Sequence, residues 1–66
     1  MTQKGRNKLL MEGWIIIRKD DTEGKEPGIK QYNENGGWEV IARFPTKAAR
    51  DRAFKQKINE VCVIED

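Results

Sequence analysis

The chain has 66 residues, with 13 Lys and Arg, 11 Asp and Glu, no His and a formal net charge of +2. Hydrophobic and charged residues each make up 36% of it, which is typical of one small soluble domain and excludes two domains by size. A chain this short buries only about 60% of the surface that its unfolded form exposes, so it has little apolar surface to spare.

The composition argues against catalysis. Neither His nor Ser occurs and Cys62 is the only thiol, so no Ser-His-Asp or Cys-His arrangement can form. Nucleophilic catalysis needs a nucleophile beside a positioned base, and so small a chain rarely forms a cleft that shifts the pKa values of paired carboxylates. We therefore expect a protein that is not an enzyme.

We also expect no metal, no cofactor and no membrane contact. Structural zinc takes about four Cys or His ligands, and this chain offers one. The acidic segment 20–26 lacks the alternating spacing of a calcium loop, and no segment approaches the roughly 20 apolar residues of a membrane span. A single Cys favours a cytoplasmic protein, because small secreted domains usually carry several.

The N-terminal residues 1–8 include Lys4, Arg6 and Lys8 but no apolar side chain after Met1. This composition predicts a flexible basic tail, followed by a single domain over residues 9–66. Three consecutive isoleucines beside Trp14 predict a strand within residues 10–19, because β-branched side chains pack well on a pleated sheet. Acidic residues, Gly and Pro then predict an exposed loop over residues 20–28.

Residues 28–33 and 38–44 are predicted to form two strands of a hairpin, because Asn35-Gly36 suits a tight turn. A two-residue turn pairs Tyr32 with Glu39 and Lys30 with Ile41. This register places one set of residues together on the outer face: Lys30, Tyr32, Glu39, Ile41 and Arg43. The opposite set is expected to face the core: Trp38, Val40, Ala42 and Phe44. A longer loop that includes Asn33 and Gly37 would instead pair Tyr32 with Trp38 and break this grouping. We favour the shorter turn.

A helix over residues 47–60 is predicted after Pro45, with Thr46 as its N-cap. Basic residues, Arg50 among them, are expected on its solvent side. The β-prone residues 61–64 predict a short last strand. The expected fold is α+β, a three- to four-stranded antiparallel sheet with one helix packed on one face, in the order β-β-β-α-β.

One helix covers only one face of a sheet, yet apolar side chains are expected on both faces. The leading hypothesis is therefore a non-enzymatic interaction module that binds another protein or forms a homodimer through the uncovered sheet face or an edge strand. The candidate partner face consists of Lys30, Tyr32, Ile41 and Arg43. As an alternative, residues 9–11 or the last strand fold back over that face.

The second hypothesis is a small nucleic-acid-binding module. Residues 38–54 resemble the strand-to-helix junction of the sheet-plus-helix DNA-binding modules of phage-type integrases, in which a Phe-x-Thr-Lys start precedes an Ala-bearing helix. The resemblance implies that the sheet enters the major groove. The candidate contacts are Lys4, Arg6, Lys8, Lys30, Tyr32 and Arg43, whereas Glu39 on the same face would oppose phosphates.

Overall fold

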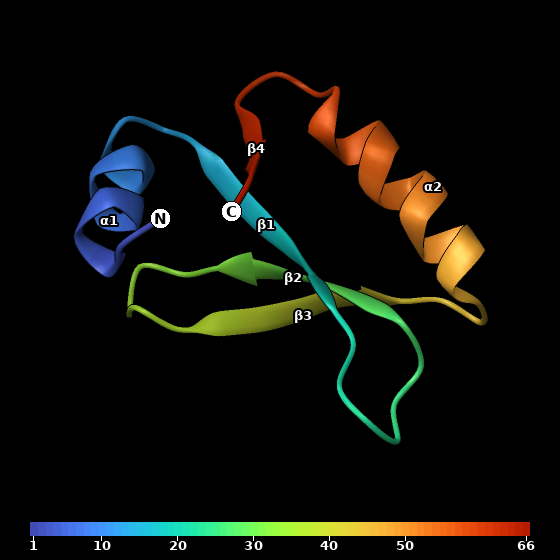
Figure 1. Cartoon of the computed structure of the whole chain (residues 1–66). Helices are drawn as coiled ribbons and strands as arrows, with labels where there is room; N and C mark the ends of the chain where they lie inside the picture. Colours follow the sequence, from blue (N-terminus) through green and yellow to red (C-terminus); the bar gives the residue numbers. More distant parts are fainter.

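The computed structural model describes all 66 residues, and the chain forms two helices and four strands (Figure 1). The elements, in chain order, are α1 (Gln3–Met11), β1 (Ile15–Asp20), β2 (Gly28–Tyr32), β3 (Trp38–Arg43), α2 (Lys47–Ile58) and β4 (Val63–Glu65). The α+β class is confirmed, and so is the series of three strands, a helix and a last strand. The first helix, α1, was not predicted.

The four strands form one sheet in the order β3-β2-β1-β4. β1, β2 and β3 are antiparallel neighbours, whereas β4 runs parallel to β1. The sheet is therefore mixed, and the prediction of a purely antiparallel sheet was wrong. The reason is that α2 carries the chain back to the end of the sheet at which β3 began, so that β4 runs in the same direction as β3.

The β2–β3 connection is the longer of the two loops considered. The N–H group of Gly36 donates to the carbonyl of Asn33 at 3.0 Å, and the N–H group of Asn33 donates to the carbonyl of Gly37 at 2.8 Å. Gly36 has a φ of 84°, as expected after a type I turn in a three-residue hairpin loop. Tyr32 consequently pairs with Trp38, and the prediction of a two-residue turn was wrong.

A bulge at Ile41 shifts the pairing of β2 with β3 by one residue. At the turn end Lys30 pairs with Val40, but beyond the bulge Ile29 pairs with Ala42, as the shorter turn would have required. The bulge divides the strand, so the expected core set does not share one face. Ala42 and Phe44 lie on the α2 side of the sheet, whereas Trp38 and Val40 lie on the other side. The predicted outer set is also divided, because Glu39 lies on the α2 side with Gln31.

The helix α2 covers one face of the sheet and forms the apolar core there (Figure 1). The hydroxyl of Thr46 accepts a hydrogen bond from the N–H group of Ala49 at 3.1 Å, which confirms the predicted N-cap. Phe54 packs against Ile17 and Ile29, and the residues around this cluster are Phe44, Ala53, Ile58 and Val63.

The helix α1 lies on the opposite side of the sheet, next to the β2–β3 turn (Figure 1). The Tyr32 hydroxyl donates to the Asn7 side chain at 2.7 Å, and Leu9 and Leu10 are half-buried. Ile16 and Tyr32, on the covered face, are at most 1% exposed. Most of the segment that was predicted to be a flexible tail, residues 1–8, thus belongs to α1, and two helices rather than one pack on the sheet. The alternative in which residues 9–11 return to this face is close to what the structure shows.

Gly36 provides a test of the observed turn. We expect Gly36→Ala to lower the free energy of unfolding by about 1 kcal/mol, because a φ of 84° disfavours a residue with a Cβ atom. Gly37→Ala is the matched control, because Gly37 has no positive φ and its added Cβ would meet Asn33 only at ordinary contact distance. Urea denaturation of both variants measures the difference, and equal losses would contradict the assigned loop.

Candidate functional site

α1 covers only the part of its sheet face that is nearest the β2–β3 turn. The other end, which we call the open half-face, consists of side chains from three adjacent strands: Arg18, Lys30, Val40 and Arg43. The three cationic side chains are 25–35% exposed, and Val40 is 40% exposed. The open half-face thus combines positive charge with a small apolar surface, and it lies on strands of the sheet rather than on a loop.

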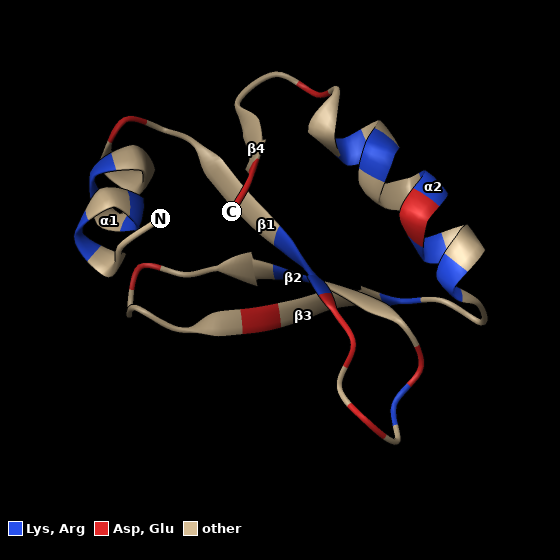
Figure 2. Ribbon diagram, viewed as in Figure 1, with Lys and Arg blue, Asp and Glu red and all other residues tan.

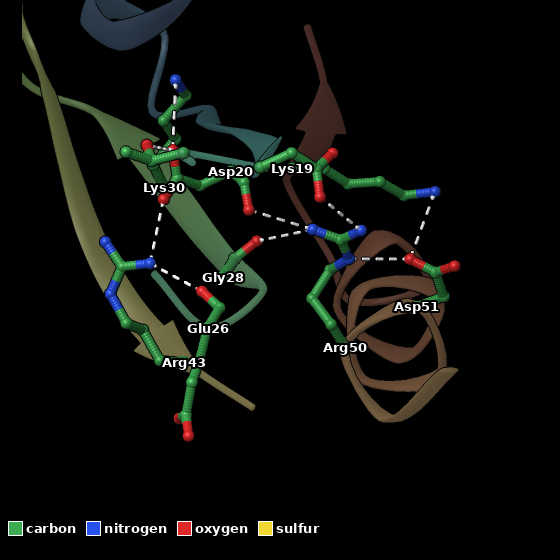
Figure 3. A network of polar contacts seen from close by, with 10 residues as sticks. Lys19, Asp20, Glu26, Gly28, Lys30, Arg43, Arg50 and Asp51 are labelled. Carbon is green, nitrogen blue, oxygen red and sulfur yellow. Dashed lines mark hydrogen bonds and ion pairs between the residues drawn. The ribbon is translucent and has the colours of Figure 1, made fainter. Parts of the chain in front are cut away.

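The carboxylate of Asp20 lies between two of these cations, Lys30 and Arg43 (Figure 3). Its side chain is 5% exposed and lies 3.1 Å from Arg43 Nη1 and 3.8 Å from Lys30 Nζ. The Thr22 hydroxyl donates to it at 2.7 Å. This hydrogen bond, together with the charges of Arg43 and Lys30, holds the pKa of Asp20 below its ordinary value although burial acts in the opposite direction. Asp20 therefore stays ionised and fixes both cations on the sheet.

Arg50 supports the same strand ends from the α2 side (Figure 3). Its Nη1 donates to the carbonyl groups of Asp20 at 3.1 Å and of Gly28 at 3.3 Å, where β1 and β2 end their pairing. Its remaining nitrogens pair with Asp21 at 3.0 Å and with Asp51 at 2.7 Å. Arg50 is only 3% exposed, so its expected place on the solvent side of the helix was wrong.

A second buried carboxylate, Asp66, lies where α1 meets the sheet. Arg6 donates to its two oxygens from Nε at 2.9 Å and from Nη2 at 3.1 Å, and Arg18 Nη2 binds it from β1. The hydrogen bonds from Arg6 lower the pKa of Asp66 strongly, and Arg18 adds to this effect against the opposing effect of burial. Asp66, which follows β4, thus links that strand to α1 and β1.

Two aromatic rings border Asp66, Arg6 and Arg18, which we call the Asp66 cluster. The Arg18 guanidinium lies 4.1 Å from the centre of the Trp38 ring, and Arg6 lies within 5.6 Å of the centres of both Trp38 and Tyr32. The rings meet edge to face, with their centroids 5.3 Å apart. These cation–π contacts hold each guanidinium on a second side, independently of the carboxylate.

Charge is distributed unevenly over the molecule (Figure 2). Acidic residues gather in the loop between β1 and β2, whereas β1, β2 and both helices carry Lys and Arg. Both carboxylates on the α1 side of the sheet are buried, and the cations that they bind reach the surface. The open half-face therefore presents positive charge outward.

The structure brings together only part of the predicted sets. Lys30 and Arg43 meet on the open half-face, but Tyr32 is buried under α1 and Ile41 lies at the bulge of the edge strand β3. The predicted tail contacts lie on α1, where Lys4 and Lys8 are exposed and Arg6 is bound to Asp66.

Four residues of this region were not predicted from the sequence: Arg18, Asp20, Trp38 and Asp66. The alternation of Ile16, Arg18 and Asp20 carries a signal for two of them, because residues two apart in a strand share a face. No pattern in the sequence places the Asp66 carboxylate beside α1.

Comparison with protein-family models, curated proteins and solved structures finds no match to this chain. No three His, Cys, Asp or Glu side chains converge into a potential metal site. Neither helix has the length and apolar character needed to cross a membrane.

The role of Arg50 can be tested by a conservative substitution. We expect Arg50→Lys to lower the free energy of unfolding by about 2 kcal/mol, because Lys cannot bind two carbonyl groups and two carboxylates at once. Arg52→Lys, an exposed position two residues along α2, is the control and should change stability little. Equal urea midpoints for the two variants would contradict the buried role.

Proposed function

We propose that this protein binds nucleic acid, with the open half-face against the phosphate backbone and the groove of a duplex. The observation that carries the proposal is the placement of Arg18, Lys30 and Arg43 on three adjacent strands of one exposed sheet surface. Cations arranged in this way can neutralise several phosphates and release their counterions. Because Asp20 holds Lys30 and Arg43 in place and the Trp38 ring packs on Arg18, less conformational entropy is lost on binding.

The arrangement of the three cations suits a duplex. They lie on adjacent strands about 4.8 Å apart, so their side chains can face the same part of a nucleic-acid backbone. The same mode of binding is implied by the resemblance of residues 38–54 to the DNA-binding modules of phage-type integrases. α1 at one end of the open half-face and the acidic β1–β2 loop at the other would limit the orientations of a bound duplex.

The observed register keeps the Glu39 carboxylate away from the cations of the open half-face. With the shorter turn, Glu39 would have stood among the cations and repelled phosphates. The three-residue turn places Glu39 on the α2 side, paired with Gln31, and the bulge at Ile41 keeps Arg43 beside Gly28 on the open half-face. The proposal therefore gains support from a feature that the sequence did not predict.

A charge substitution on the open half-face tests the proposal. We expect Lys30→Gln to weaken binding to a mixed-sequence DNA duplex and to reduce the slope of log affinity against log salt by about 1, because one phosphate contact is lost. Fluorescence anisotropy over a salt series measures both quantities.

The matched control is Lys55→Gln, which removes the same charge from the exposed side of α2. It should leave affinity and slope close to those of the unmodified protein. Absence of duplex binding at low salt, or an equal loss in the two variants, would contradict the proposal.

A second candidate function is self-association or protein binding through the edge strand β3. Val40 and Ile41 are each 40% exposed there, and β3 has a neighbour on one side only. An exposed edge strand can accept a strand from another chain. Tyr32, which belonged to the predicted partner face, is instead covered by α1.

Sedimentation over about a hundredfold range of concentration tests this second candidate. If β3 pairs with a second copy, the average mass rises with concentration, and Ile41→Lys abolishes the rise because a charged edge strand resists pairing. A concentration-independent monomer would exclude self-association. Duplex binding is measured separately, so the two functions can be distinguished.

A further inference from the structure

We infer that Arg6 and Arg18 form a second phosphate-binding site, and that the Asp66 side chain occupies this site as an internal competitor until a phosphate group displaces it. This inference rests on the proposed function, because it adds a contact and a means of regulation to the same side of the sheet. It concerns the place where α1 and the open half-face meet.

The geometry around Asp66 is that of an anion-binding site. Arg6 presents Nε and Nη2 to the two carboxylate oxygens at 2.9 and 3.1 Å, and Arg18 Nη2 binds one of the same oxygens. A paired donor of this kind matches a phosphate as well as a carboxylate. Two guanidinium groups therefore share one side-chain carboxylate.

The site does not depend on Asp66 for its shape. The ring of Trp38 lies 4.1 Å from the Arg18 guanidinium and 5.4 Å from that of Arg6, and Tyr32 lies 5.6 Å from Arg6. Tyr32 is in turn fixed to α1 by its hydrogen bond to Asn7. The two guanidinium groups would thus stay close together when one anion replaces another.

A bound nucleic acid would reach this site from the open half-face. Arg18 belongs to both, because it binds Asp66 and is paired across the strands with Lys30. Its side chain is 35% exposed although that of Asp66 is only 5% exposed. When one phosphate of a nucleic-acid backbone contacts Lys30, the next phosphate can therefore contact Arg18.

Asp66 can leave the site without loss of the sheet. Its backbone N–H group donates to the carbonyl of Ile17 at 3.0 Å, and this bond is separate from its carboxylate. Rotation about the side-chain bonds alone would withdraw the carboxylate and free both arginines. While the carboxylate is bound, the apparent affinity for phosphate is reduced by the fraction of molecules in which the site is free.

The test compares Asp66→Ala with Glu65→Ala. Both variants lose one carboxylate from consecutive residues, but Glu65 lies on the α2 side of the sheet beside Lys19 and Phe54. We expect Asp66→Ala to bind a DNA duplex more tightly than the unmodified protein, with a log–log salt slope steeper by about 1. Glu65→Ala should leave the slope unchanged. Circular dichroism checks that each variant is folded, and Asp66→Asn, which keeps the side-chain volume, should change affinity in the same direction.

Inorganic phosphate provides a readout that does not depend on nucleic acid. In NMR titrations, the Nε–H resonances of Arg6 and Arg18 should shift at lower phosphate concentration in Asp66→Ala than in the unmodified protein or in Glu65→Ala. Unchanged titrations, or duplex affinity that Asp66→Ala and Asp66→Asn fail to raise, would overturn the inference and leave the proposed function standing. Arginine shifts with phosphate, combined with no duplex binding by any variant, would overturn the proposed function alone.

Discussion

One extra residue in β3 determines which side chains share a face of this sheet. Side chains alternate between the two faces along a strand. The extra residue at Ile41 interrupts this alternation, so residues 42–43 point to the face opposite to the one that an unbulged strand would give them. Ala42 can thus pack toward α2 while Trp38 packs toward α1. Without the bulge, the three-residue turn and the pairing of Gly28 with Arg43 could not coexist. The facing of Ala42 toward the apolar core and of Arg43 toward the open half-face both depend on this local irregularity.

The two sides of the sheet are held by different forces. On the α2 side, burial of Ile17, Ile29 and Phe54 supplies the hydrophobic stabilisation that a small domain requires. On the α1 side, a short helix without any fully buried residue is held by a hydrogen bond, ion pairs and aromatic contacts. A chain with limited apolar surface can in this way cover two faces, because charged and aromatic groups replace part of a second apolar core.

This difference explains how far the sequence could predict the fold. α2 was predictable because Thr46 caps it and apolar residues recur at helical spacing, and the strands were predictable from isoleucines and alternation. α1 was missed because its contacts with the sheet come from Arg6 and Asn7, which resemble solvated residues in composition. The register failed for a related reason: Asn35-Gly36 indicates a turn, but the side chain of Asn33, which accepts from two backbone N–H groups, selects the longer loop.

The candidate site was predictable only where it follows the strand pattern. Lys30 and Arg43 were assigned to one face correctly, since the shorter turn and the bulged register agree at that end of the hairpin. Their partner Asp20 could not be assigned, because its burial depends on a neighbouring strand and on Arg50 from the opposite side of the sheet. Buried carboxylates beneath surface cations have two opposing effects on an anionic ligand: they orient the cations, and they cancel part of their charge. In a site of this kind, the geometry of the ligand contributes more to recognition than the net charge does. The affinity for phosphate can therefore be adjusted where one internal carboxylate is exchanged for one external phosphate.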